Sequence, residues 1–166
     1  MNNPTTAVKS ASENGTETDD TLPFLYPIIY SANFKIGTLK HAAIVLELWK
    51  DFDDNTLDNG THVFADEVRM DFADGTSFSG NRDAFMDVMK QQRQTFKAFI
   101  SYIDAVVSLA PQGKNETWAC VWGKQVSETI DYKHNEVLIN ENWMFDAAGK
   151  VSYIRQFSAV PQPLVG

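Results

Sequence analysis

The feature that most constrains the fold is an alternation of apolar and polar residues from about residue 98 almost to the end of the chain. A period of two predicts β-strands that bury one face. Three segments of typical turn composition interrupt the alternation: PQGKN, DYKHN and DAAGK. Strands joined by such short turns run antiparallel. The pattern therefore predicts a meander of strands at 98–109, 116–130, 136–146 and 150–159.

Helical patterns precede this meander. Residues 38–54 predict a helix with Thr38 as a candidate N-cap, and its buried face carries Ala42, Val45, Trp49 and Phe52 at helical spacing. A short helix is predicted at 56–64, and a third begins at Asn81 and continues to about Lys97. Helices followed by a meander predict an α+β arrangement.

One further strand is predicted between the second and third helices. Val68, Met70 and Phe72 alternate there with Arg69 and Asp71, so the three apolar residues should face the core. The following segment, ADGTSFSG, has the composition of a turn.

The chain divides into three parts by composition. Residues 1–21 are polar and predict a flexible N-terminal tail. Residues 22–37 are apolar but carry Pro23 and Pro27, which predicts an extended arm covering the core or a dimer partner. Residues 38–160 form the folded domain.

Composition and charge exclude several classes of function. The net charge is −8 and no Lys/Arg run occurs, so no nucleic-acid partner is expected. No apolar run is long enough for a membrane span, and the N-terminus lacks a secretory pattern, so we expect a cytoplasmic protein.

Three segments resemble the nuclear-transport-factor-2-like superfamily, in the branch of SnoaL-like polyketide cyclases and ketosteroid isomerase. FDDNTL at 52–57 with VFADEV at 63–68, SGNRDAF at 79–85 and FDAAGKV at 145–151 match its motifs in order and spacing. The resemblance implies a cone-shaped, curved antiparallel sheet with three N-terminal helices closing the concave face. It also implies a pocket inside the sheet and, commonly, a homodimer.

The strand near 137–145 contains the strongest candidate for a functional residue. Its odd positions are the more apolar, and Glu141 is the one charge among them. A carboxyl group buried on such a face needs a partner or a raised pKa, which marks a candidate functional site. The alternatives are that Glu141 pairs with an Arg, or that the register differs by one residue.

The resemblance assigns further positions. Glu141 falls where ketosteroid isomerase keeps a protonated acid in its oxyanion hole. Phe72 and Leu48 stand where that enzyme has its general base and its catalytic Tyr, so the same activity is not expected. Gln156 stands where limonene-epoxide hydrolase keeps a catalytic Asp, and it is a candidate to hydrogen-bond Glu141.

The last strand gives two conflicting predictions. Counting from Gly149 of the family motif predicts that Ser152, Ile154 and Ser158 face the pocket. Apolar alternation instead predicts that Val151, Tyr153 and Phe157 form the buried face. The candidate ligand-binding residues are Gln156, Trp143, Ile139, Ile154, Phe72 and Trp122.

Trp118, Cys120, Trp122 and Val126 share one face of the strand at 116–130. We interpret this face as core, with pocket walls as the alternative. Lys124 lies on the same alternation and is a candidate partner for Glu141.

No metal or cofactor is expected. His41, His62 and His134 have no ligand spacing, and neither a phosphate-binding loop nor a nucleophile elbow is present.

Two functions remain open from the sequence. The first is a small-molecule-binding domain for an apolar or aromatic ligand, with cofactor-independent isomerisation, cyclisation or dehydration as its enzymatic form. The second is a non-catalytic homodimerisation module, in which Asn140 and Asn142 on the even face of their strand lie in a polar interface.

Overall fold

The computed structural model describes residues 24–161. The chain divides into two units, Met1–Tyr30 and Ser31–Gly166. In the first unit, residues 24–30 form no helix or strand and their side chains are exposed. The predicted tail at 1–21 and the first two residues of the predicted arm lie outside the described residues, so the role of the arm stays a prediction.

The three predicted helices are present. They are α1 (Leu39–Asp54), the 3₁₀ helix η1 (Leu57–Val63) and α2 (Arg82–Gln94). Helix α2 ends three residues before the predicted end at Lys97, because strand β4 already begins at Phe96. The buried face of α1 includes Val45 and Trp49, as its helical spacing predicts.

The two helix N-termini differ in how they are capped. The Asn81 side chain accepts a hydrogen bond of 2.9 Å from the Ala84 N–H at the start of α2. Thr38 takes the N-cap position of α1 with extended backbone, but its side chain makes no capping bond. Thr38 is therefore the N-cap residue, as predicted, but its side chain adds no capping bond.

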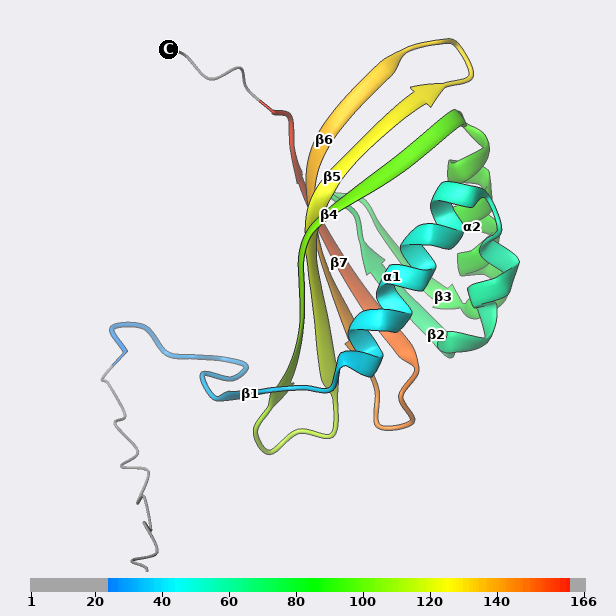
Figure 1. The fold of residues 1–166 in the computed structure, drawn as a ribbon. Helices are drawn as coiled ribbons and strands as arrows, with labels where there is room; N and C mark the ends of the chain where they lie inside the picture. The colour runs from blue at the N-terminus through cyan, green and yellow to red at the C-terminus, as the bar shows by residue number, and fades with distance from the viewer. Residues whose placement is uncertain (1–23, 162–166) are drawn as a thin grey trace, which may run out of the picture. The chain divides into compact units, whose positions relative to one another are not determined.

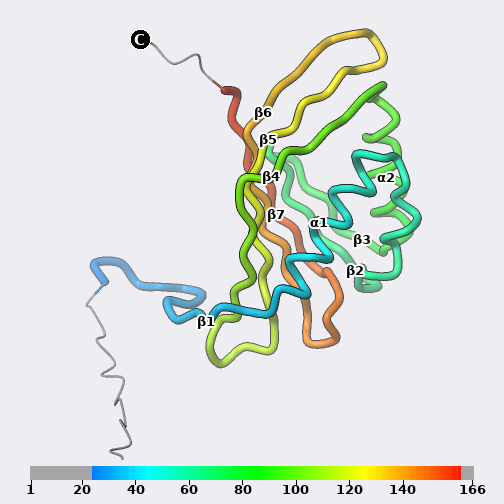
Figure 2. Tube along the Cα trace, viewed as in Figure 1, coloured from blue at the N-terminus to red at the C-terminus, as the bar shows by residue number. Residues whose placement is uncertain are grey.

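The sheet of the second unit has seven strands in the order β1-β4-β5-β6-β7-β2-β3. The long strands β4–β6 bend along their length, and α1 and α2 lie on the concave side (Figures 1 and 2). The strand bounds are β1 Phe34–Ile36, β2 Phe64–Asp71, β3 Ser77–Asn81, β4 Phe96–Pro111, β5 Thr117–Thr129, β6 His134–Phe145 and β7 Val151–Ala159.

The predicted α+β class with a curved sheet and three helices is confirmed, and β4–β7 form the expected antiparallel meander. One pairing is not antiparallel, because β2 lies parallel to β7. The segment predicted as a turn after β2 contains both a turn around Gly75 (φ +87°) and strand β3, which pairs with β2. The sheet is therefore mixed.

A bulge contributes to the curvature of the sheet. The register between β4 and β5 shifts between Ile103 and Ala105, opposite Gly123. A Cβ atom at Gly123 would lie 2.3 Å from the Tyr102 carbonyl oxygen and 3.3 Å from the Trp49 ring. Glycine at this position therefore lets β4 approach β5 closely and leaves room for the Trp49 indole.

The core lies between the concave face of the sheet and the helices. Fully buried side chains come from α1, α2, β2 and the meander; among them are Val45, Val68, Met70, Phe85, Val121, Phe145, Val151 and Ile154. The buried Arg93 guanidinium donates to the main-chain oxygens of Phe52, Asp53 and Phe96. It thereby satisfies carbonyl groups at the C-terminal end of α1 and fixes α2 against α1.

The capping difference generates a stability prediction. We expect Asn81→Ala to lower the free energy of unfolding by about 1 kcal/mol, because it removes a side-chain cap. Thr38→Ala is the matched control, since it replaces an N-cap residue that makes no such bond. Urea denaturation of both variants measures the difference, and equal losses would contradict the assignment of the cap.

Candidate active site

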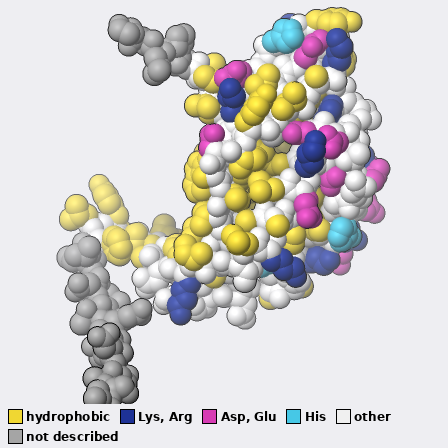
Figure 3. Space-filling view, viewed as in Figure 1, with side chains coloured by type: hydrophobic (Ala, Val, Ile, Leu, Met, Phe, Trp, Pro, Cys, Tyr) yellow, Lys and Arg dark blue, Asp and Glu magenta, His cyan; other side chains and the backbone are white. Residues whose placement is uncertain are grey.

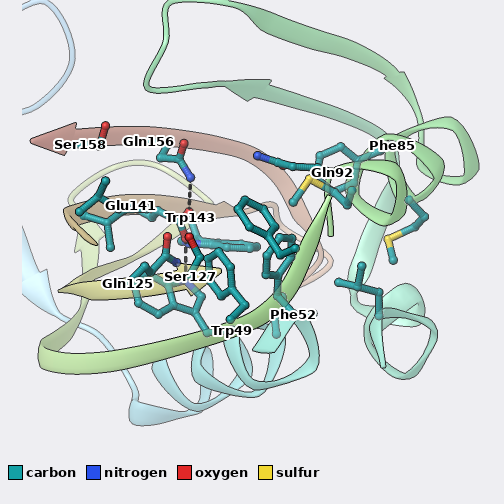
Figure 4. A pocket seen from close by; sticks show the side chains of 18 of the residues that line it. Trp49, Phe52, Phe85, Gln92, Gln125, Ser127, Glu141, Trp143, Gln156 and Ser158 are labelled. Atoms are coloured by element: carbon teal, nitrogen blue, oxygen red, sulfur yellow. Dashed lines mark hydrogen bonds between the residues drawn. The ribbon is translucent and has the colours of Figure 1, made fainter. Parts of the chain in front are cut away.

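A cavity of about 290 Å³ lies between the concave sheet face and the helices (Figure 4). Its walls come from α1, η1, α2 and strands β2 and β4–β7. They are mostly apolar: Leu48, Trp49, Phe52, Leu57, Phe64, Phe85, Met86, Met89, Phe96, Phe99, Val137, Ile139 and Trp143. Neutral polar groups also line it: Gln92, Gln125, Ser127, Asn135, Gln156 and Ser158. Gln92, Asn135 and Ser158 are exposed, so the cavity opens to solvent where they lie.

Glu141 is the one ionisable side chain among the described residues that line the cavity. It projects from the middle of β6 and is 5% exposed. Its cross-strand partner on the same face is Val121, which is fully buried. The predicted orientation of the odd face of β6 is therefore observed.

Three N–H groups converge on the Glu141 carboxyl group (Figure 4). Its Oε2 atom accepts from Trp49 Nε1 at 2.6 Å and from Trp143 Nε1 at 3.0 Å. Its Oε1 atom accepts from Gln156 Nε2 at 2.8 Å. The donors come from α1, β6 and β7, so this carboxyl group joins a helix to two neighbouring strands.

The Gln156 amide has a fixed orientation. Its Oε1 atom accepts from the Ala73 N–H at 3.3 Å, while its Nε2 atom donates to Glu141. Both bonds can form only with the amide nitrogen toward the carboxyl group. Gln156 therefore acts toward Glu141 as a donor, as the two indoles do.

Burial and hydrogen bonding act on the charge of Glu141 in opposite directions. Burial raises the pKa of the carboxyl group, and this is the largest effect; the bonds from Gln156, Trp49 and Trp143 lower it. The ionised carboxylate keeps all three bonds. The neutral acid has one O–H to donate, and none of its three partners is an acceptor toward it.

Four of the predicted site residues line the cavity: Glu141, Gln156, Trp143 and Ile139. The hydrogen bond expected between Gln156 and Glu141 is present. On β7, Gln156 and Ser158 both line the cavity, as the count from the family motif predicts, whereas apolar alternation is right for the buried Val151 and wrong for the exposed Phe157. The register shift between Met144 and Phe145 at the start of the β6–β7 pairing explains why a count by alternation fails there.

The other three predicted ligand-binding residues do not line the cavity. Ile154 is fully buried in the core. Phe72 follows the last residue of β2 and packs, half-buried, at the edge of that core. Trp122 is 42% exposed on the opposite face of the sheet. Their assignment to the cavity is wrong.

The prediction that the Trp face of β5 lies in the core is wrong for Trp122, although Cys120 on the same face is buried. Val121 and Ala119 are the core residues of β5, so Trp118, Cys120 and Trp122 point to the convex side. Lys124 lies on that side too, where it pairs with Glu136 at 3.3 Å and not with Glu141. Apolar content alone predicts a core position for the aromatic residues of β5, because it does not distinguish the concave face of the sheet from an apolar convex face.

Trp49 is a partner of Glu141 that the sequence pattern does not reveal. Helical spacing predicts that Trp49 is buried, and a buried indole N–H needs an acceptor, which is the one signal that points to such a partner. Ser127, Gln125 and Asn135 were missed as well. These polar residues lie toward the open end of an otherwise apolar cavity, and the sequence gives no pattern that would find them.

In the part of the chain that the structure describes, no group of three His, Cys, Asp or Glu residues could hold a metal ion. Within the same residues, no helix is both long and apolar enough to cross a membrane.

His41 stacks on Phe145 with ring centroids 4.3 Å apart, and burial lowers the pKa of its imidazole.

Comparisons with known proteins support the fold. No protein-family model matches the sequence, and no curated protein matches it. Many solved structures resemble it, and three serve as examples. An uncharacterised protein with a cystatin-like fold from Caulobacter vibrioides has a TM-score of 0.62 and 13% identity, over 72% of this chain and 87% of that one. A provisionally named dehydratase from the NTF2-like family of Streptomyces avermitilis gives 0.59, 8%, 72% and 94%, and a provisionally named SnoaL-like polyketide cyclase from Jannaschia sp. CCS1 gives 0.58, 12%, 72% and 85%. The domain therefore has the nuclear-transport-factor-2-like fold, as its motifs predict.

The raised pKa of Glu141 generates a prediction on stability. Because burial raises the pKa of Glu141, the folded state binds the proton of this carboxyl group more tightly than the unfolded state does. The pKa of Glu in the unfolded state is about 4.3. The contribution of Glu141 to stability is therefore full below that pH and is lost as the pH rises through the folded pKa. Wild type should lose stability relative to Glu141→Gln as the pH rises.

Urea denaturation of both proteins between pH 3 and pH 8 measures this effect. Glu67→Gln, at an exposed position of β2, controls for the loss of one negative charge. A stability difference between wild type and Glu141→Gln that stays constant with pH would contradict the assignment.

Proposed function

We propose that this domain binds a small, largely aromatic or apolar molecule in the cavity, and that Glu141 exchanges a hydrogen bond or a proton with its polar group. The observation that carries the proposal is one buried carboxyl group, held by three donors, in the wall of an apolar cavity. Ligand sites are typically concave and apolar, with a few polar groups that fix orientation.

The volume and lining set the size and type of ligand. About 290 Å³ is close to the lower limit of typical small-molecule sites. Rings from helix and sheet, such as Trp49, Phe85 and Trp143, favour a flat aromatic body. The neutral polar groups at the open end suit a second polar group on the ligand.

The reaction class that fits one carboxyl group is proton transfer without a cofactor. A single carboxylate can remove a proton from one atom and return it to another, which is sufficient for isomerisation and contributes to cyclisation or dehydration. The names of two structural neighbours, a polyketide cyclase and a dehydratase, agree with this class. Because those identities are 12% and 8%, the proposal depends on the cavity itself.

Filling the cavity tests the proposal. Val137→Trp places an indole at a half-buried wall position and should abolish the thermal stabilisation that bound ligands give to the wild type. The measurement is a thermal-shift screen with aromatic and apolar compounds of different charge, together with native mass spectrometry of the purified protein. Asn142→Ala, on the opposite sheet face, is the control and should bind as wild type does.

Two outcomes would count against the proposal. One is a screen in which no compound stabilises the wild type. The other is a set of ligands that bind Val137→Trp as well as they bind the wild type, because they would occupy a different site. Ligands that bind wild type and Glu141→Gln equally would leave binding intact but remove the role of Glu141.

A second candidate function, homodimerisation, is favoured by the convex face of the sheet. Tyr102, Trp122, Leu138 and Phe157 are exposed there on neighbouring strands, each between 42% and 51%. Figure 3 shows hydrophobic side chains gathered beside the strands that face the viewer in Figure 1. We propose that a second copy of the chain covers this apolar face, with half-buried Asn140 at its centre.

A charge in this face should disrupt the dimer. We expect Trp122→Glu to shift the molecular mass in sedimentation-equilibrium experiments from that of a dimer to that of a monomer, because it would bury an unpaired carboxylate in the contact. Gln112→Glu, in the exposed turn after β4, is the control. A wild-type protein that is monomeric at all concentrations would contradict the proposal.

A further inference from the structure

The hydrogen bonds around Glu141 fit only a charged carboxylate. Trp49, Trp143 and Gln156 all donate to it, and the Gln156 amide cannot reverse without losing its bond to the Ala73 N–H. A carboxylate has about four positions that accept hydrogen bonds. Three are occupied by the protein, so one stays open to a group in the cavity.

Burial makes this charged form costly. Removing a carboxylate from water costs several kcal/mol unless an opposite charge compensates it. Lys, Arg and His are absent from the described residues that line the cavity. The candidate cation, Lys124, lies on the convex side of the sheet with Glu136. The protein therefore arranges its donors for an anion but supplies no counter-charge.

The walls have the chemistry that attracts an organic cation. Trp49 and Trp143 direct their N–H edges at Glu141, and their rings still form part of the lining. Phenylalanine rings lie on other sides: Phe52, Phe64, Phe85, Phe96 and Phe99. Aromatic faces attract ammonium groups, and most strongly when water is excluded.

We propose that the polar group bound at Glu141 is a protonated or quaternary amine, carried by an aromatic or apolar body. This inference rests on the proposed ligand-binding function and specifies its ligand class. A cation supplies the missing counter-charge and packs against the aromatic rings, and a protonated amine also donates a hydrogen bond to the open position on the carboxylate. An anion would meet an uncompensated carboxylate, and a neutral molecule would leave that carboxylate without a counter-charge.

The net charge of the whole protein also favours the binding of a cation. Its net charge is −8. Such a field raises the local concentration of cations and lowers that of anions.

A pair of isosteric compounds tests the charge directly. Benzyltrimethylammonium and neopentylbenzene have the same shape and differ in one atom, N⁺ against C. We expect the wild-type chain to bind the ammonium compound at least about 10-fold more tightly, as measured by quenching of tryptophan fluorescence. Glu141→Gln should remove most of this preference and leave the affinity for neopentylbenzene within about 3-fold, whereas Glu136→Gln should bind both compounds as the wild type does.

A second measurement needs no variant. Benzyltrimethylammonium has no titratable proton, so a proton released on binding comes from the protein, and Glu141 is the one titratable group among the described lining residues. Calorimetry in buffers of different ionisation enthalpy should detect this release. The affinity for the ammonium compound should rise with pH, while that for neopentylbenzene should not rise.

The outcomes separate this inference from the function on which it rests. If neopentylbenzene binds as tightly as the ammonium compound, or if cation binding is independent of pH and of Glu141, the cation inference is overturned and binding in the cavity stands. If neither compound binds and Val137→Trp alters no ligand response, both proposals are overturned.

Discussion

The contact between the Glu141 carboxyl group and three N–H donors connects the architecture of this domain with its chemistry. It joins the middle of α1 to β6 and β7, on the concave side of the sheet. Hydrogen bonds to a charged group contribute about 1.5–3 kcal/mol each, which offsets much of the cost of burying it. The same bonds hold the Trp49 and Trp143 rings where they line the cavity, so one polar contact defines both its charge and part of its shape.

Much of the fold could be predicted because its signals are local. Alternation and turn composition place β4–β7 within a few residues, and helical spacing places α1 and α2. The inward orientation of Glu141 could be predicted for the same reason, because the odd positions from Val137 to Phe145 are apolar apart from Glu141 itself. These predictions need no knowledge of which elements become neighbours.

The predictions that failed depend on contacts between distant segments. The parallel pairing of β2 with β7 joins residues that are more than 80 positions apart, and nothing in either strand shows it. Trp122 was assigned to the cavity because it is apolar, but both sheet faces carry aromatic residues, and the helices cover only one of them. Trp49 was recognised as buried, yet its hydrogen-bond partner lies 92 residues further along the chain.

The cavity places two physical requirements on Glu141 that cannot both be met by the protein alone. Exclusion of water favours the neutral acid, whereas three donors without an acceptor favour the carboxylate. Replacing the carboxyl group by an apolar residue would remove the conflict, but it would leave two indole N–H groups without a partner. The remaining way to satisfy both requirements is to change what occupies the cavity, because the charge of the occupant decides which form of Glu141 is stable. Under the proposed ligand-binding function, the protonation state of Glu141 follows the charge of the ligand, and a ligand that carries a positive charge resolves the conflict most completely.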